Sequence, residues 1–300
     1  MRVPHPIPYQ GSKRNLAERI LGFFPRDFDR VVEPFAGSAA ISLASGVRWR
    51  NLAFLLNDAH GPVAGLWRAI LDSPHELADG YSRLWHEQLG RERRYYDIVR
   101  DRFNETHQPA DFLYLLARCV KAAIRYNTAG HFNNSPDNRR RGARPEVMRQ
   151  RILGAWSVLS GRTKVENMDY TEVLSACSHN DLVYMDPPYR GVCLKRDSRY
   201  APTVDHEQFM DVLASMNTRG FSFIVSYDGR TDEKVYAESI PREIGLEHFE
   251  LPAGRSTQAT LLGRSSMTFE SLYLSRAVAD RLVDEPARCG AMQPLLFTGH

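Results

Sequence analysis

The sequence predicts an α/β protein built around a parallel sheet. Two consecutive segments, 29–44 and 51–71, each run from a short apolar strand through a turn into a helical pattern. A buried strand opens the segment 181–189, and a helix, a glycine and another strand follow over 206–229. Strands that alternate with helices in this way are typical of parallel sheets with crossover helices.

A helical insertion is expected between the second and third of these units. Residues 72–165 are rich in helix formers, Arg and Asn, and they show no clear strand. We interpret 72–154 as a helical domain of its own. The main domain is then discontinuous and consists of 1–71 and 155–278.

The end of the main domain predicts a β-hairpin. The segments "IGLEHFELPA" (244–253) and "MTFESLYLS" (267–275) each have the composition of a strand, and a polar loop joins them. Residues 279–300 show no convincing periodicity and are expected to form a tail.

Composition limits the classes of protein that the chain can represent. It has 300 residues, 43% apolar and 25% charged, as ordinary globular proteins do. The net charge is only +3, so affinity for a polyanion would have to come from local clusters. Four cysteines without CxxC spacing indicate reduced thiols rather than a zinc site or any other metal site. The N-terminus lacks a signal-peptide pattern and no apolar stretch approaches ~20 residues, so we expect a cytoplasmic protein without membrane contact.

Acidic residues follow three of the expected strands. Glu33, Asp58 and Asp186 each stand where a strand ends, and ligands of open α/β sheets bind beyond those ends. The turn "EPFAGSAA" lets the backbone approach a ligand closely at Gly37, but it matches neither a dinucleotide fingerprint nor a P-loop. Asp58 is placed to hold a ribose diol or, alternatively, to cap the next helix, and both uses remain open.

The tetrapeptide Asp186-Pro187-Pro188-Tyr189 is the most informative strand end. Its two prolines fix two φ angles and remove two N–H donors, which leaves an acid and rigid carbonyl acceptors beside an aromatic ring. That surface suits a planar ligand with an exocyclic amine, such as a nucleobase extruded from a duplex. A stiffened strand exit with Tyr189 as packing is the alternative.

Taken in order, these segments resemble the Dam-like group (class alpha, D12 type) of S-adenosylmethionine-dependent DNA N6-adenine methyltransferases. The resemblance extends from about residue 5 to about residue 276, and the order of the blocks makes it specific. Its main blocks are "PYQGSKR" (8–14), "VVEPFAGSAA" (31–40), "LLNDAHGPVAGLWRAI" (55–70), "FLYLLARCVKAAIRYNTAGHFNNSP" (112–136) and "DPPY" (186–189).

The resemblance implies a Rossmann-like class I methyltransferase sheet with a C-terminal β-hairpin and an inserted, mainly helical target-recognition domain. It also implies a site-specific enzyme that moves a methyl group from S-adenosylmethionine to N6 of a flipped adenine in double-stranded DNA. The residues that it places at the cofactor are Tyr9, Lys13, Glu33, Phe35, Gly37, Asp58, Asp169 and Asp186. Those that it makes catalytic are Asp186, Pro187, Pro188 and Tyr189.

DNA contacts are expected from basic and amide side chains in two segments. Runs of Arg and Lys are often merely solvated, but beside a base pocket they fit phosphate contacts. Arg and Asn can also read guanine and adenine edges, respectively. The expected DNA-binding residues are Lys121, Arg125, Asn127, Asn133, Arg139, Arg140, Lys195 and Arg196.

Two positions depart from the family pattern. Ala39 occupies the last position of the F-x-G-x-G turn, where the family usually has glycine. Val120-Lys121 stand where GATC-specific members tend to have an aromatic residue and Asn, so the resemblance does not imply recognition of GATC.

Two other functions remain open at this point. The first is methyl transfer to cytosine N4, although such enzymes more often have Ser in place of the first Asp of DPPY. The second is a catalytically silent relative that binds DNA. A cognate restriction endonuclease is a partner that family habit suggests, and the sequence does not define an oligomeric state.

Overall fold

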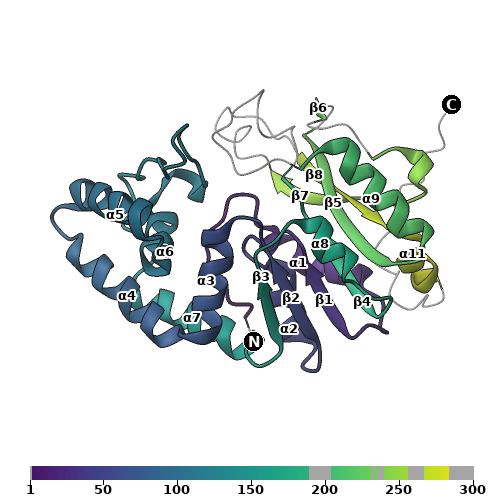
Figure 1. Ribbon diagram of the computed structural model, residues 1–300, viewed down its shortest axis with the longest axis horizontal. Helices are drawn as coiled ribbons and strands as arrows, with labels where there is room; N and C mark the ends of the chain where they lie inside the picture. Colours follow the sequence, from purple (N-terminus) through teal and green to yellow (C-terminus); the bar gives the residue numbers. More distant parts are fainter. Residues whose placement is uncertain (1, 189–203, 232–233, 236–239, 256–266, 284–300) are drawn as a thin grey trace.

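The computed structural model describes residues 2–188, 204–231, 234–235, 240–255 and 267–283. Its centre is an eight-stranded sheet in the order β3-β2-β1-β4-β5-β8-β7, with β6 paired to β5 (Figure 1). The strands are β1 (Arg30–Glu33), β2 (Ala53–Asn57), β3 (Thr163–Glu166), β4 (Asp181–Met185), β5 (Ser222–Thr231), β6 (Lys234–Val235), β7 (Glu247–Arg255) and β8 (Met267–Leu274).

The pairing of the strands confirms the predicted fold class. β1 to β5 are parallel, whereas β8 runs antiparallel to both β5 and β7. The chain therefore moves outward from β1 to β3, returns to β4 on the other side of β1 and ends in the expected hairpin. This order is that of a class I methyltransferase sheet, and its topological switch point lies between β1 and β4.

Helices cover both faces of the sheet and form the insertion. The α-helices are α1 (Ala17–Ile20), α2 (Ala40–Arg48), α3 (Gly61–Asp72), α4 (Pro74–Glu87), α5 (Glu92–Thr106), α6 (Pro109–Arg118), α7 (Pro145–Leu159), α8 (Tyr170–Ser175), α9 (His206–Thr218) and α11 (Arg276–Val283). Short 3₁₀ helices are η1 (Lys13–Asn15), η2 (Leu21–Phe23), η3 (Val120–Ala122) and η4 (Arg242–Ile244). Among the described residues, no helix combines the length and the apolarity that crossing a membrane requires.

Alternate residues of the central strands enter two hydrophobic cores. Val31 packs in the core beneath α2 and α3, and its neighbour Val32 packs in the core beneath α8 and α9. Leu182 and Val183 of β4 divide in the same way. Burial on both faces explains why these strands are apolar throughout rather than alternating.

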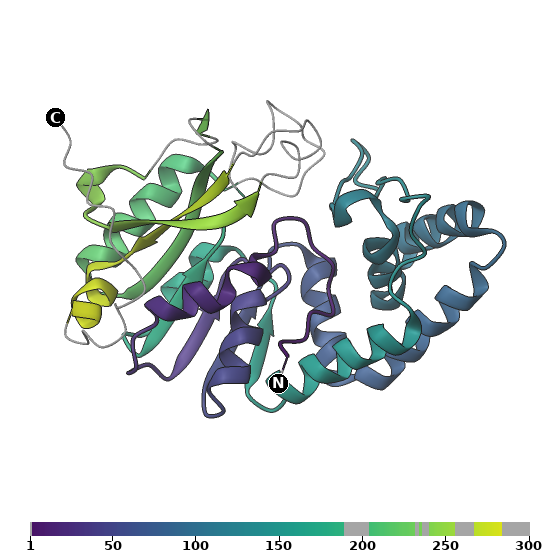
Figure 2. The ribbon, with the colours of Figure 1, turned by 180° about the vertical axis from the view of Figure 1, so that it is seen from behind.

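The helical insertion consists of α4, α5, α6, the loop after α6 and α7, and it lies beside the β3 edge of the sheet (Figure 1). Its buried residues belong to the same core as α2 and α3, so the insertion is packed against the sheet domain. α7 contacts α2, α3 and α4. The N-terminal segment passes between the insertion and the sheet (Figure 2).

The structure differs from the sequence interpretation at three places. β3 lies within the stretch that showed no clear strand, because none of its four residues is fully buried at the sheet edge and they lack an apolar signature. α7 continues through the expected domain boundary at residue 154 and ends at Leu159. α11 begins at Arg276 and extends into the expected tail as far as Val283, and Val278, just before that tail, is fully buried.

Candidate active site

A cavity of about 470 Å³ opens beyond the carboxyl ends of β1, β2 and β4. It lies at the switch point of the sheet, where parallel α/β folds bind their ligands. Pro187 and Pro188 line it together with the residues expected at the cofactor. Those residues are Tyr9, Lys13, Glu33, Phe35, Gly37, Asp58, Asp169 and Asp186.

The turn between β1 and α2 forms the floor of the cavity. Gly37 has φ +47°, and a Cβ there would stand 3.1 Å from the ring of Tyr9. Its carbonyl accepts a hydrogen bond from Trp67 Nε1 at 2.9 Å. The position therefore needs glycine both for its backbone conformation and for the space that Tyr9 occupies. Ala39 also has a left-handed conformation, with φ 45°, so the departure from glycine is accommodated with strain.

Asp58 fastens this turn to the end of β2. Its carboxylate accepts hydrogen bonds from the backbone N–H of Gly37 and of His60, both at 2.9 Å. The N-cap residue of α3 is His60, so Asp58 does not cap that helix through its own position. Burial raises the pKa of Asp58 to about 6. Each carboxylate oxygen has a second lone pair with which to accept a hydroxyl group.

Glu33 is a buried acid at the end of β1. One of its oxygens accepts a hydrogen bond from the backbone N–H of Ser42 at 2.7 Å, and the side chain is almost inaccessible. Burial raises the pKa of this carboxyl to about 7, although the bond from Ser42 opposes the shift. A positive ligand group in the cavity would favour the ionised form.

Asp186 lies at the end of β4 and forms an ion pair across the cavity. Its Oδ1 is 3.0 Å from Nζ of Lys13, which comes from η1. Burial raises the pKa of Asp186, and Lys13 opposes that shift. Below it, the hydroxyls of Tyr184 and Ser226 share a hydrogen bond of 2.7 Å. Tyr189 lies outside the described residues.

Asp169 caps a helix as well as lining the cavity. Its carboxylate accepts a hydrogen bond from the backbone N–H of Thr171 at 2.9 Å and thereby caps α8. Phe35 and Tyr170 form a tilted aromatic pair beside it, with ring centroids 5.2 Å apart. This end of the cavity therefore offers an aromatic wall and a carboxylate.

The insertion reaches the rim of the cavity through the segment after α6. Ala122, Ala123 and Ile124 line the cavity, and the carbonyl of Ala122 accepts a hydrogen bond from the backbone N–H of Gln10 at 3.2 Å. Lys121 is exposed beside them and has φ 59°. Of the expected DNA-binding residues, Lys121 and Arg125 thus directly flank these lining residues in sequence.

Asn127 and Asn133 belong to a hairpin-like loop. Asn127 Oδ1 accepts hydrogen bonds from the N–H groups of Ala129 and His131, at 3.0 and 2.9 Å. Asn133 is exposed, and its N–H donates to the carbonyl of Arg125 at 3.0 Å. The amide oxygen of Asn127 is therefore engaged in holding the turn.

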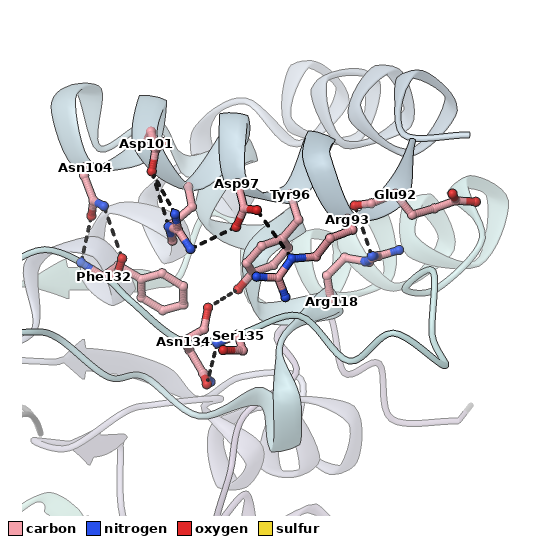
Figure 3. Close-up of polar contacts among 11 residues, drawn as sticks. Glu92, Arg93, Tyr96, Asp97, Asp101, Asn104, Arg118, Phe132, Asn134 and Ser135 are labelled. Atoms are coloured by element: carbon pink, nitrogen blue, oxygen red, sulfur yellow. Dashed lines mark hydrogen bonds and ion pairs between the residues drawn. The ribbon is translucent and has the colours of Figure 1, made fainter. Parts of the chain in front are cut away.

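Helix α5 supports this loop from behind. Asn104 bonds both the carbonyl and the N–H of Phe132, and the hydroxyl of Tyr96 donates to the carbonyl of Asn134 at 2.9 Å (Figure 3). Asn134 in turn donates to the carbonyl of Ala123 at 2.8 Å. The loop is consequently connected to the cavity rim by a continuous set of hydrogen bonds.

Arg139 and Arg140 lie apart from this loop, on the exposed stretch before α7. Arg140 Nε lies 3.4 Å from a carboxylate oxygen of Asp137, and the N–H of Arg139 bonds the other oxygen at 3.0 Å. Neither residue lines the cavity. Lys195 and Arg196 lie outside the described residues.

Two residues at the site carried no signal in the sequence interpretation. His60 Nε2 and the hydroxyl of Tyr126 are 2.6 Å apart, which joins the end of β2 to the insertion. Burial lowers the pKa of His60 to about 4, so the ring is neutral. Glu270 of β8 lies with its Oε1 2.8 Å from Lys13 Nζ. Both contacts join segments that are far apart in sequence, so no local sequence pattern could predict them.

Known proteins provide an independent comparison. The chain is 28% identical over 186 residues to the DNA N-6-adenine-methyltransferase of Escherichia phage P1. The aligned region covers 60% of this chain and 23% of that protein. It is 27% identical over 226 residues to the Retron Ec67 DNA adenine methylase of Escherichia coli. This alignment covers 73% of this chain and 75% of that protein. The Type II methyltransferase M.MjaIII of Methanocaldococcus jannaschii is 20% identical over 300 residues. This alignment covers 95% of this chain and 94% of that protein.

The extent of these matches differs among the relatives. The chain spans about a quarter of the length of the phage P1 protein but most of the length of the other two. The family model for D12 class N6 adenine-specific DNA methyltransferases matches residues 9–252, which include every described strand from β1 to β6 and the whole cavity lining. With the sheet order and the acid-lined cavity at its switch point, this match shows that the chain belongs to the D12 class N6 adenine-specific DNA methyltransferase family.

Proposed function

We propose that this protein transfers a methyl group from S-adenosylmethionine to N6 of an adenine that is flipped out of double-stranded DNA. The observation that carries the proposal is the position of Asp186, at the end of β4 on the wall of the cavity. Family membership supports the reaction, and the charge of the cavity supports the cofactor. A protein that modifies DNA in this way would work in the cytoplasm.

The donor set of the cavity fits a cationic cofactor. Glu33, Asp58 and Asp186 line it, and the pKa of each is raised by burial, so each would gain from a positive ligand. The sulfonium and ammonium groups of S-adenosylmethionine supply such charge. A phosphate-bearing cofactor would instead be repelled by these acids. Lys13 would not offset that repulsion, because it is already paired with Asp186.

Individual residues would hold different parts of this cofactor. Asp58 would accept the ribose hydroxyls, because its oxygens keep lone pairs beyond those used by Gly37 and His60. Glu33 would face the ammonium end. Phe35 and Tyr170 would flank the adenine ring of the cofactor, and when bound the cofactor supplies an electrophilic methyl group.

Asp186 and Pro187 would act on the target amine. The lone pair of an exocyclic adenine amine is delocalised into the ring, which makes it a poor nucleophile. Hydrogen bonds from the amine to the Asp186 carboxylate and the Pro187 carbonyl would localise that lone pair on nitrogen. Positioning of the two reactants is the larger contribution and can supply several kcal/mol. We expect Tyr189, outside the described residues, to stack on the flipped base.

The insertion would grip and read the DNA. We propose that 72–154 forms the recognition domain and that 1–71 with 155–278 forms the catalytic domain. Arg125 and Asn133 are exposed on the hydrogen-bonded loop next to the cavity rim, where base edges could be read. Lys121, Asn127, Arg139, Arg140, Lys195 and Arg196 complete the proposed contacts, chiefly with the backbone.

A relative that is named as a modification methylase suggests one further partner. The chain is 25% identical over 198 residues to Modification methylase StsI of Streptococcus sanguinis, covering 62% of this chain and 29% of that protein. We propose a cognate restriction endonuclease on this basis. DNA methylated by the protein should then resist that nuclease at the shared site.

The Asp186→Asn variant tests the reaction. We expect the single-turnover rate of methyl transfer to DNA to fall by about 100-fold or more, because the amide can donate a hydrogen bond where an acceptor is needed. Asp181→Asn, at the opposite end of the same strand, is the matched control. It breaks the pair of Asp181 with Arg30 and should lower stability without a comparable loss of rate.

A near-normal rate with Asp186→Asn would remove this residue from the mechanism. The two alternatives give other results. A cytosine-N4 enzyme would place the methyl group on cytosine, and a silent relative would bind DNA without transferring any methyl group.

A further inference from the structure

Glu270 on β8 reaches the candidate active site from a strand beyond the residues that the family model matches. Its Oε1 is 2.8 Å from Lys13 Nζ, and the same Nζ is 3.0 Å from Asp186 Oδ1. The side chains of Lys13, Glu270 and Asp186 are 10%, 12% and 24% exposed. One largely buried ammonium is therefore shared by two carboxylates, and solvent screens these interactions less than it would at the surface.

An irregularity of the sheet accompanies the placement of Glu270. Between β5 and β8, Ser226 pairs with Leu272 and Gly229 pairs with Glu270, so two residues of β5 face the single residue Ser271. Such a bulge twists the strand and re-aims neighbouring side chains, and bulges occur often beside active sites. Ser226 is also bonded to Tyr184 of β4, the strand that ends in Asp186.

The charges around Asp186 come from several elements. Among the described residues, Lys13 of η1, Glu33 of β1 and the phenols of Tyr9 and Tyr184 interact with Asp186 directly, and Glu270 of β8 is connected to it through Lys13. A lone Lys13–Asp186 pair would be neutral. Glu270 contacts the same ammonium, so the carboxylates of Glu270 and Asp186 compete for Lys13.

We propose that Glu270 is a positioning residue of the methyl-transfer site, which anchors Lys13 and shares its charge so that Asp186 keeps accepting capacity for the adenine amine. This inference rests on the proposed function of Asp186. It adds a residue from the C-terminal hairpin to a site otherwise built from the N-terminal segment and the ends of β1, β2 and β4.

Glu270→Gln and Lys13→Gln should change Asp186 in opposite directions. Glu270→Gln keeps the shape of the side chain but removes its charge, so Asp186 no longer shares Lys13 with this carboxylate and the pKa of Asp186 falls. Lys13→Gln removes the only described cation paired with Asp186, so that pKa rises. A general loss of structure would not produce shifts of opposite sign.

The experiment is a ¹³C NMR titration of aspartate-labelled protein without cofactor, with Asp186 assigned from the signal that Asp186→Asn removes. We expect the pKa of Asp186 to fall in Glu270→Gln and to rise in Lys13→Gln. Glu247→Gln, exposed on β7, is the matched control and should leave the titration unchanged. Thermal unfolding of each variant shows whether it is folded.

Kinetics of the same variants provide the second measurement. Glu270→Gln should lower kcat by about tenfold, the factor that corresponds to one pKa unit, with KM for DNA within about twofold of the wild type. An unchanged or raised pKa of Asp186 in folded Glu270→Gln would overturn the role of Glu270. If the shift appears but the wild type transfers no methyl group, the proposed function fails and the charge sharing stands.

Discussion

Two buried acids of the cavity and a buried acid of the helical insertion are held in opposite ways. In the cavity, Glu33 and Asp58 accept backbone hydrogen bonds but form no ion pair with any Lys or Arg in the described part of the chain. In the insertion, Asp111 accepts two hydrogen bonds from Arg102, at 2.7 and 2.5 Å. Arg118, only 2% exposed, donates to Gln88 Oε1 at 2.6 Å.

This difference separates charges that stabilise the fold from charges that await a ligand. Burying a charge without a counter-ion costs free energy, and the protein responds by raising the pKa values of Glu33 and Asp58 to about 7 and 6. The insertion lowers that cost by pairing Asp111 with Arg102, and by giving the guanidinium of Arg118 the amide oxygen of Gln88 as an acceptor. Glu33 and Asp58, which lack such a counter-ion, are therefore functional candidates, whereas the Arg102–Asp111 pair is structural.

Arg118→Met should have the largest effect on stability. It removes a buried guanidinium and its charged hydrogen bonds, and we expect the free energy of unfolding to fall by about 3 kcal/mol. Cofactor affinity should stay within about twofold. Urea unfolding and calorimetry measure the two quantities, and Arg139→Met, at an exposed position, should change stability by no more than about 0.5 kcal/mol. A large loss of cofactor affinity in folded Arg118→Met would break the comparison.

Asp58→Asn should have the reverse profile. Loss of a charged acceptor for the ribose hydroxyls costs about 2 kcal/mol, so the Kd for S-adenosylmethionine should rise by about 30-fold. Stability should change little, because Asn can still accept a hydrogen bond. Asp101→Asn, exposed on α5, controls for the loss of one charge. Equal Kd values for the two variants would remove Asp58 from the cofactor site.

The pH dependence of the two properties should also differ in sign. Protonation of Glu33 near pH 7 removes the partner of the cofactor ammonium, so the Kd should rise by about tenfold between pH 8 and pH 6. The raised pKa of Glu33 acts oppositely on the free protein. Its contribution to stability is fully present below the unfolded pKa of 4.5 and is lost as the pH rises through about 7.

Glu33→Gln tests both the pH dependence of the cofactor Kd and the pH dependence of stability. The variant should flatten the pH dependence of the Kd and remove this part of the pH dependence of unfolding. A wild-type Kd that does not change between pH 8 and pH 6 would argue against a cationic ligand beside Glu33.

Tyr126→Phe should affect the link between the two regions. It deletes the hydrogen bond with His60, at 2.6 Å, and leaves the ring in place. We expect KM for DNA to rise by about fivefold, equivalent to about 1 kcal/mol, with cofactor Kd nearly unchanged. Tyr95→Phe, which loses a hydroxyl bonded to Glu87 within the insertion, is the control. Identical kinetics in both variants would show that the link plays no part in DNA binding.

Ala39→Gly should have the smallest effect. Ala39 has φ 45°, where glycine meets no steric penalty, so the substitution should stabilise the fold by about 0.5–1 kcal/mol. Ala40→Gly, one residue later inside α2, should instead destabilise it by a similar amount. Urea unfolding compares them, and equal losses in both variants would contradict the assigned strain.

Much of the fold could be predicted from local sequence. The central strands are apolar runs that end in acids, and the hairpin of β7 and β8 shows the expected strand composition. β3 could not be predicted, because "TKVE" at a sheet edge carries no apolar signature and its pairing with β2 is a long-range property. α11 was not predicted for a similar reason, because this short helix is fixed by the packing of Val278 and Leu282 against the core, which is a long-range property.

The strand pattern predicted the site residues that follow strands, whereas Tyr9 and Lys13 were expected from the family resemblance. Strand ends meet at one edge of a parallel sheet, so the amino-acid sequence alone is enough to group Glu33, Asp58 and Asp186. The contacts of Glu270 and His60 depend on a bulge and on the docking of the insertion, and neither has a local sequence pattern. The hydrogen bonds that the side chain of Asn127 accepts within its own turn likewise could not be predicted from the sequence.

The central claim is that the acid-lined cavity at the switch point of the sheet is where an adenine and a methyl donor meet. Its most direct test is nucleoside mass spectrometry of DNA incubated with the protein and S-adenosylmethionine, beside the Asp186→Asn variant. We predict N6-methyladenine with the wild type and none above background with the variant. N4-methylcytosine as the product, or N6-methyladenine formed equally by the variant, would contradict this account.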